Sequence, residues 1–327
     1  MTIAVTGATG YVGRVLMDRL LANGASVRAL VRDPDAALPA GVERAVADLA
    51  APEGLDRALA NVDVLVHAAV DQRATSRARH RLVNVLGTRA LLDAAAQAGV
   101  RRVVHLSTIA VYPRHDGALP VSPDDALDPF PELRDDYAWS KIGAEGWVAL
   151  HRRGGHDTVT LRLGIVYGRG RDFVARVWRR LAGPVAVIGG SRGMLLPLVH
   201  VDDVAEAVWR VADARRVAQP VLHVVGPEQP TQASYLARRA AYRDKLVPVY
   251  VSLAAFRGLT ERRAWAHALR RAGGSSRAYA LAWTAQQARY DMRPTERALG
   301  WVPRIGLDDG LRGPATPDAP AAAVAAG

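Results

Sequence analysis

Short apolar runs alternate with stretches of helical periodicity along most of the chain. The runs typical of buried parallel strands cover residues 3–5, 27–31, 42–46, 62–66, 103–106 and 159–163. Between them, apolar residues recur at helical spacing from Val12 to Leu20 and over a longer stretch from Ser76 to Gln97. A helix from Asp202 to Val211 and a strand over 221–225 follow. The alternation predicts an α/β fold: a Rossmann doubly wound parallel sheet with a smaller C-terminal substrate lobe.

Segments that break the alternation define the expected domains. We expect a Rossmann domain over residues 1–166 and 199–228. Residues 167–198 and 229–312 are expected to form a substrate-binding lobe above the carboxyl ends of the strands. The Ala/Pro-rich end, residues 313–327, is expected to be a disordered tail.

The composition is that of a globular protein. Half of the 327 residues are hydrophobic, and no apolar run reaches the roughly 18 residues of a membrane span. The chain starts directly on a strand, without the basic start and apolar core of a signal peptide. It has no cysteine, which excludes disulfides and thiolate metal sites. These features predict a cytoplasmic enzyme with no membrane partner and no metal.

The net charge of +11 raises the question of a nucleic-acid partner. Of the 43 basic residues, however, only Lys141 and Lys245 are lysines, and the 41 arginines are spread along the chain. There is no long basic block and no aromatic-basic RNA motif. A compositional preference for arginine explains the charge, and we expect no nucleic-acid partner.

A glycine-rich turn, Thr-Gly-Ala-Thr-Gly-Tyr-Val-Gly at residues 6–13, joins the first strand to the first helix. Glycines at such a turn let a pyrophosphate approach the backbone, and the helix N-terminus offers free N–H groups and a positive dipole end. The turn therefore predicts a dinucleotide site. The residues expected to contact the cofactor here are Gly7, Thr9, Gly10, Tyr11, Val12 and Gly13.

The end of the second strand indicates which dinucleotide binds. Rossmann sites for NAD usually carry an acid there that bonds the ribose 2′-hydroxyl, but Val31 stands in that place and Arg32 follows. A guanidinium forms charge-assisted bonds to a 2′-phosphate, so Arg32 predicts NADP(H). The alternative is that Arg32 is a surface residue and Asp33 binds the ribose of NAD(H). Asp48 and Leu49, after the third strand, are expected at the adenine, unless Asp48 only caps a helix.

Candidate chemistry follows the fifth strand. The strand leads into Ser107 and Thr108, and further along come Tyr137 and Lys141, one helical turn apart on the same face. A lysine ammonium beside a phenol favours the phenolate and lowers the phenol pKa from about 10 towards working pH. Such a phenol can exchange a proton with a carbonyl/alcohol pair. With nine tyrosines and two lysines in the chain, a Tyr-x-x-x-Lys spacing is expected about 0.06 times by chance.

Together with other motifs, these residues make the chain resemble an extended short-chain dehydrogenase/reductase of the NAD-dependent epimerase/dehydratase family, on its reductase-like branch. The resemblance covers about residues 1–312. Besides residues 6–13, 107–112 and 137–141, the motifs that carry it are His-Ala-Ala at 67–69, Asn-Val-Leu-Gly-Thr at 84–88, Arg-Leu-Gly-Ile-Val-Tyr-Gly at 162–168, Val-His-Val-Asp-Asp-Val-Ala at 199–205 and Leu-Gly-Trp-Val-Pro at 299–303.

The resemblance implies catalytic roles for residues that match the family motifs. Tyr137 would be the proton donor or acceptor, and Lys141 would hold the nicotinamide ribose and tune Tyr137. Thr108 would bond the substrate oxygen, with Ser107 the weaker candidate for this role.

Other matching residues would surround the cofactor or brace the fold. The further cofactor contacts implied are Ala68, Ala69, Gly164 and Val166. Asn84 and His67 are equally consistent with structural roles, Asn84 bracing its helix and His67 closing the fourth strand. His105 is expected in the core, and His200 is expected to set the turn before the Asp202 helix.

Departures from the family patterns favour a ketoreductase. Dehydratases of the family that the chain resembles carry a Thr-Asp-Glu motif after the fifth strand. Here Ile109 and Ala110 follow Thr108 instead of the two acids. Nucleotide-sugar enzymes often carry an arginine before the Val-x-Asp turn, where this chain has Leu-Leu-Pro-Leu-Val at 195–199. Arg192 or another arginine is the alternative diphosphate ligand. Family epimerases mostly retain NAD, whereas NADPH suits net reduction.

The leading hypothesis is therefore an NADPH-dependent ketoreductase for a small to medium, partly apolar ketone. Trp178, Trp265 and Trp283 would line the substrate site or belong to the core. The alternatives are a nucleotide-sugar 4-epimerase or 4-ketoreductase, and a non-catalytic NADP(H)-sensing protein, a class that tends to lose the tyrosine or lysine. Family members commonly pair through helices near 80–98 and 137–153, so a homodimer is a further expectation.

Overall fold

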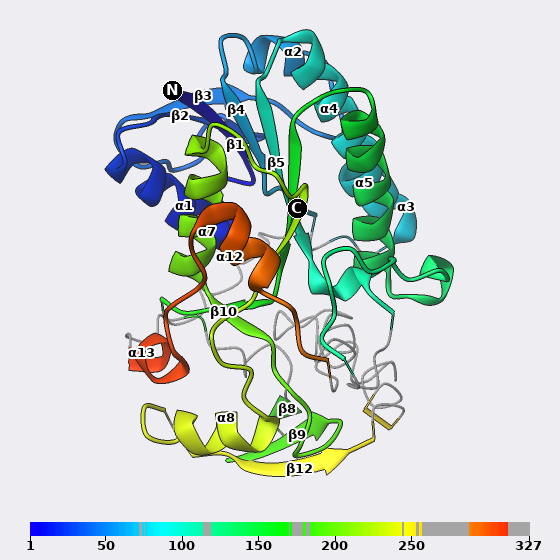
Figure 1. The fold of residues 1–327 in the computed structure, drawn as a ribbon, viewed down its shortest axis with the longest axis vertical. Coiled ribbons are helices and arrows are strands. Elements are labelled where there is room, and N and C mark those ends of the chain that lie inside the picture. The colour runs from blue at the N-terminus through cyan, green and yellow to red at the C-terminus, as the bar shows by residue number, and fades with distance from the viewer. Residues whose placement is uncertain are drawn as a thin grey trace, which may run out of the picture.

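The computed structural model describes residues 1–71, 74, 76–113, 119–169, 171, 179–180, 184–243, 245–252, 255–256 and 288–312. Within them the chain forms a large parallel sheet with helices on both faces and a smaller β structure beyond one end of it (Figure 1). None of the helices in this part of the chain has both the length and the apolar composition of a membrane span.

Seven parallel strands form the central sheet in the order β11-β6-β5-β4-β1-β2-β3. The order reverses between β1 and β4, which is the topological switch point where doubly wound sheets bind their ligands. The strands are β1 (Thr2–Thr6), β2 (Ser26–Val31), β3 (Val42–Val46), β4 (Val64–His67), β5 (Arg102–Thr108), β6 (Thr158–Leu163) and β11 (Val221–Val224).

Helices cover both faces of this sheet, and the central strands β1, β4 and β5 are buried along nearly their whole length. α1, α7 and α12 lie on one face, and α4 and α5 lie on the other (Figure 1). Leu16 of α1 and Val208 of α7 belong to one buried cluster, whereas Leu91 of α4 and Val148 of α5 belong to another. The helices are α1 (Tyr11–Ala22), α2 (Leu55–Ala58), α3 (Arg77–His80), α4 (Gly87–Gln97), α5 (Asp136–Arg153), α7 (Val201–Asp213) and α12 (Arg293–Leu299).

A separate three-stranded sheet, in the order β12-β9-β8, lies beyond the carboxyl ends of the central strands (Figure 1). Two parallel strands, β7 and β10, follow β6 and precede α7. Ile188, Tyr235 and Leu311 belong to the buried cluster of this region. The remaining elements are β7 (Ile165–Tyr167), β8 (Arg179–Arg180), β9 (Val185–Gly189), β10 (Leu198–His200), α8 (Gln232–Arg239), β12 (Val247–Val251) and α13 (Leu307–Arg312).

The predicted fold class is confirmed, and one predicted helix differs in form. The helix expected from Ser76 to Gln97 contains a π-helical segment, η1 (Arg81–Leu86), between α3 and α4. The hydroxyl of Thr88, in the first turn of α4, donates to the Asn84 carbonyl at 2.6 Å, which satisfies an acceptor in the widened turn. Trp178, Trp265, Trp283 and the predicted tail lie outside the described residues.

Candidate functional site

The glycine turn between β1 and α1 packs closely on itself and on the loop after β4. Gly7 has φ +72°, and a Cβ on it would lie 2.8 Å from the Ala69 Cα. A Cβ on Gly13 would lie 2.2 Å from the Gly7 carbonyl oxygen. α1 begins at Tyr11 with Gly10 as its N-cap, which has no side chain to bond the first turn of the helix, and the positive end of a helix dipole favours an anion. The turn therefore fits a dinucleotide, and Gly7, Gly13 and Ala69 meet there.

A chain of buried hydrogen bonds holds the loop after β4 over Gly7. Ala69 N donates to the Thr6 hydroxyl at 3.2 Å, and Thr6 contacts His67 Nδ1 at 2.8 Å. His67 Nε2 contacts the Thr88 hydroxyl at 2.9 Å. Because Thr88 donates its own proton to the Asn84 carbonyl, His67 must donate through Nε2 and accept from Thr6. Burial, followed by the positive charge of Lys141, lowers the pKa of His67 to about 3, so the ring stays neutral.

The residues expected at the adenosine end lie at the carboxyl ends of β2 and β3. Arg32 is exposed and has neither a hydrogen bond nor an ion pair within the described residues. The Asp33 carboxylate accepts from Asp35 N at 2.9 Å, and that of Asp48 accepts from Ala50 N at 2.9 Å. Asp48 therefore closes its own turn and caps none of the described helices.

Three other residues expected to contact the cofactor, Leu49, Gly164 and Val166, are held by packing or strand pairing. Leu49 packs on Gly87, the first residue of α4, where a Cβ would lie 2.7 Å from the Leu49 Cβ. A Cβ on Gly164 would lie 2.4 Å from the Pro197 carbonyl oxygen. Val166 lies on β7 and pairs with Val199 of β10. The Gly164–Val166 segment directly follows Leu163, the last residue of β6, and these contacts hold it against β10 and the residue before it.

The three candidate catalytic residues lie around the carboxyl end of β5. Thr108 is the last residue of β5, half-buried, and its hydroxyl accepts from Ala110 N at 3.2 Å to cap the short helix η2 (Ile109–Val111). Tyr137 is half-buried in the first turn of α5, and Lys141 follows one turn later. Lys141 is only 4% exposed and donates through Nζ to the Leu106 carbonyl at 2.7 Å. The ammonium group therefore lies against β5, two residues before Thr108.

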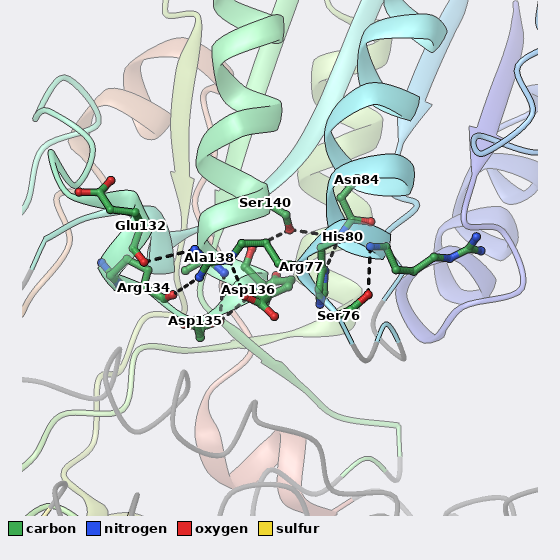
Figure 2. A network of polar contacts seen from close by, with 12 residues as sticks. Ser76, Arg77, His80, Asn84, Glu132, Arg134, Asp135, Asp136, Ala138 and Ser140 are labelled. Carbon is green, nitrogen blue, oxygen red and sulfur yellow. Dashed lines mark hydrogen bonds and ion pairs between the residues drawn. The ribbon is translucent and has the colours of Figure 1, made fainter. Parts of the chain in front are cut away.

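Polar contacts from two directions fix the N-terminus of α5. The Asp135 carboxylate caps the helix by accepting from the backbone N of Tyr137 and of Ala138, both at 3.1 Å. Burial raises the pKa of Asp135 although these hydrogen bonds oppose the shift. Arg77 of α3 contacts Asp136 at 2.7 Å and donates to the Arg134 carbonyl at 3.0 Å (Figure 2).

Asn84 braces the same helix from the π segment. Its amide donates to the Ser140 hydroxyl at 3.1 Å, and Ser140 donates to the Tyr137 carbonyl at 2.9 Å (Figure 2). Its amide oxygen accepts from Asp71 N at 2.8 Å. Asn84 thus connects the loop after β4 to the turn that carries Tyr137, and its contact with His80 Nδ1 at 3.0 Å also lies within its own helix, as the bracing role expects.

A buried ion pair between Glu145 and Arg162 lies next to Ser107, the residue before Thr108. The neighbouring Ser107 donates to Glu145 of α5 at 2.5 Å, and Glu145 pairs with Arg162 of β6 at 2.7 Å. Both side chains are 6% exposed. Burial disfavours the charge on Arg162, but the hydrogen bonds and charge of Glu145 outweigh it and raise the guanidinium pKa.

Hydrogen bonds connect this ion pair to Tyr112 and His223. Arg162 donates to the Tyr112 hydroxyl at 2.5 Å, and that hydroxyl lies 2.6 Å from His223 Nε2. Burial lowers the pKa of His223 to about 3, so the ring is neutral. Its Nδ1 contacts the Asp291 carbonyl at 3.1 Å and must donate there, so Nε2 accepts from Tyr112. The network joins β5, β6, β11 and the segment after them.

Sequence reasoning missed this network and the arginines around Tyr137. The available signals were Arg162, a single charge within the apolar run 158–163, and Glu145, one turn after Lys141 on the inward face of its helix. His105 is buried as expected, and His200 caps α7 by accepting from Asp202 N at 3.3 Å. Within the described residues, no three His, Asp or Glu side chains are grouped closely enough to hold a metal ion.

Comparison with known sequences agrees with this geometry. The NAD dependent epimerase/dehydratase family profile matches residues 3–226. A 4-hydroxy-2-methyl-3-oxo-4-farnesyl-3,4-dihydroquinoline-1-oxide ketoreductase of Stigmatella aurantiaca is 40% identical over 174 residues, which are 51% of this chain and 51% of that relative. A dTDP-6-deoxy-L-talose 4-dehydrogenase (NAD(P)(+)) of Kitasatospora kifunensis is 32% identical over 238 residues, 68% of this chain and 73% of that relative.

Among solved structures, MoeE5 in complex with UDP-glucuronic acid and NAD is similar along nearly the whole chain. The two share 26% sequence identity and a TM-score of 0.73, with 95% of this chain and 96% of MoeE5 covered. The similarity to the ketoreductase spans only about half of each protein, whereas the similarity to MoeE5 covers nearly the whole length of both.

Proposed function

Because the chain belongs to the NAD dependent epimerase/dehydratase family, we propose that it is an NADPH-dependent ketoreductase for a small to medium, partly apolar ketone. One observation carries the proposal: Lys141, one turn after Tyr137 on α5, donates its ammonium to the Leu106 carbonyl of β5, two residues before Thr108. The glycine turn with its close Ala69 contact supports a cofactor pyrophosphate beside them.

Each of the three residues has a distinct task in the proposed reduction. Bound NADPH would supply the hydride that adds to the carbonyl carbon. Tyr137 donates its hydroxyl proton to the carbonyl oxygen as that oxygen gains charge. Thr108 orients the same oxygen by a hydrogen bond, and the Lys141 ammonium stabilises the tyrosinate left behind. The proton lost by Tyr137 is replaced from solvent after the alcohol leaves.

The character of the surrounding segments supports reduction of an apolar ketone. Ile109 and Ala110 follow Thr108, so no acid stands there to assist an elimination. The segment from Leu195 to Val199 is apolar and largely buried, which offers no cation for a sugar diphosphate. The relative from Stigmatella aurantiaca is a ketoreductase whose name specifies a farnesylated ketone.

The direct test is NADPH oxidation by purified protein with a panel of apolar ketones. We expect turnover of at least one ketone and none with UDP- or dTDP-sugars.

A nucleotide-sugar 4-epimerase or 4-ketoreductase is the second candidate, favoured by the similarity to MoeE5 with its bound UDP-glucuronic acid. Thermal protection and turnover with nucleotide sugars would select that candidate. Tight NADPH binding without turnover of any carbonyl compound would instead indicate an NADP(H) sensor.

Replacing Arg32 by alanine tests the preference for NADPH. Arg32 is exposed at the end of β2 without an ion pair in the described residues, so its charge is available for a 2′-phosphate. Charge-assisted bonds of about 1.5–3 kcal/mol predict that NADPH affinity falls about 10- to 100-fold while NADH affinity stays unchanged. Calorimetric titration with both cofactors measures this. The exposed Arg216, in the loop before β11, gives the control variant Arg216→Ala, and equal effects of both substitutions would refute the assignment.

A further inference from the structure

Arg134 lies between the two segments that carry the proposed catalytic groups. It directly precedes Asp135, the residue that caps α5, and its side chain is only 6% exposed. Its guanidinium donates to the carbonyls of Ala110 at 2.9 Å and Tyr112 at 2.8 Å. It also pairs with the Asp128 carboxylate, which is nearly as buried.

The carbonyls that Arg134 holds belong to the turn that positions Thr108. Ala110 donates its backbone N–H to the Thr108 hydroxyl at 3.2 Å, and Tyr112 N contacts the Ile109 carbonyl at 3.3 Å. One planar guanidinium therefore holds the middle residue and the C-cap of η2, the short helix that Thr108 caps at its N-terminus. The Asp128 backbone N donates to the Val111 carbonyl at 2.9 Å, so the anionic partner of Arg134 is tied to the same turn.

The backbone of Arg134 is tied to the Tyr137 side of the site. Its N–H contacts the Pro131 carbonyl at 3.0 Å within η3 (Pro131–Leu133), and its carbonyl accepts from Arg77 at 3.0 Å (Figure 2). Arg77 also holds Asp136, the first residue of α5. Motion of the Arg134 backbone would therefore carry the Asp135 cap and the first turn of α5 with it.

We propose that Arg134 is a positioning residue that sets the spacing between Thr108 and Tyr137, an inference that rests on the proposed ketone reduction. The side chain holds the Thr108 turn, and the backbone holds the start of the Tyr137 helix. Lysine cannot replace it, because a single ammonium lacks the fork that reaches two carbonyls and a carboxylate together. Reacting groups displaced by about 1 Å lower the rate about 100-fold.

The test compares Arg134→Lys with Arg102→Lys as a matched control. Arg102 is 1% exposed, donates to the Val211 carbonyl at 2.7 Å and pairs with Asp157 at 2.6 Å. It lies at the opposite, amino end of β5. Both substitutions replace a buried guanidinium that bonds backbone carbonyls and one carboxylate. Only Arg134, however, contacts the turn after Thr108 and precedes the helix that carries Tyr137.

Arg134→Lys is expected to lower kcat for ketone reduction about 100-fold, with the dissociation constant for NADPH changed by less than about twofold. Arg102→Lys is expected to lower the melting temperature and leave kcat within about twofold of the parent value. If Arg134→Lys does not fold, Arg134→Ala is assayed with added guanidinium ion, which is expected to restore part of the lost kcat. A parent-like kcat in a folded Arg134 variant, or a failure of guanidinium to restore any activity, would overturn the proposal.

Amide hydrogen exchange separates this proposal from the proposed function. Arg134→Lys is expected to increase exchange in both 108–112 and 134–138, and Arg102→Lys in neither. If the parent protein reduces no ketone, the proposed function fails, while the joint increase in exchange still supports the positioning role. Unchanged exchange in either segment would overturn the positioning role whatever the activity.

Discussion

Replacing Tyr137 by phenylalanine is expected to lower kcat for ketone reduction about 1000-fold, within the range that general acid catalysis contributes. The substitution removes only the hydroxyl that would protonate the carbonyl oxygen. The backbone N of Tyr137 still bonds Asp135, and its carbonyl still bonds Ser140, so α5 is expected to keep its place. NADPH oxidation at saturating ketone measures the effect, and calorimetry checks that NADPH still binds.

Two buried histidines of the neighbouring strands β4 and β5, His67 and His105, are unable to supply that proton in place of Tyr137. His67 is neutral with both ring nitrogens hydrogen-bonded, and burial holds the pKa of His105 far below its usual value. The control variant is Tyr250→Phe, because Tyr250 is a half-buried tyrosine on β12, which belongs to a different sheet from β5. Its kcat should equal that of the parent enzyme. More than a tenth of parent activity in Tyr137→Phe would mean that another group delivers the proton.

The sequence predicted the fold and the family because their signals are local. The apolar runs and the glycine turn each lie within a few residues, and Tyr137 and Lys141 share one helical face. The strands form close to the expected positions, and the family that the motifs implied is confirmed by a profile match over residues 3–226, a shorter range than the expected 1–312.

The residues that support the site could not be predicted in the same way, because their contacts join distant parts of the chain. Glu145 and Arg162 meet only when α5 packs on the sheet, and Arg134 reaches carbonyls 22 and 24 residues earlier. Carbonyl groups carry no residue-type signal, so an arginine that binds them cannot be distinguished in sequence from the many arginines at the surface. The π segment depends likewise on the partners that Asn84 finds on α5 and after β4.

Replacing Glu145 by glutamine is expected to destabilise the fold by about 3 kcal/mol or more, because removing one partner of a buried ion pair leaves the other charge uncompensated. The charge left behind is that of Arg162, which is 6% exposed and lies between β5 and β11 in the sheet. Chemical denaturation with urea, followed by far-UV circular dichroism, measures the free energy of unfolding.

Two further variants show whether the uncompensated charge is the cause of this loss. Asp93→Asn breaks the exposed pair with Arg89 on α4, and a change below about 1 kcal/mol is expected there. The double variant Glu145→Gln/Arg162→Met removes the charge as well, so it should recover a large part of the stability that Glu145→Gln loses. If the double variant is no more stable than Glu145→Gln, the stabilisation comes from the hydrogen bonds to Ser107 and Tyr112, and the ion pair contributes little of its own.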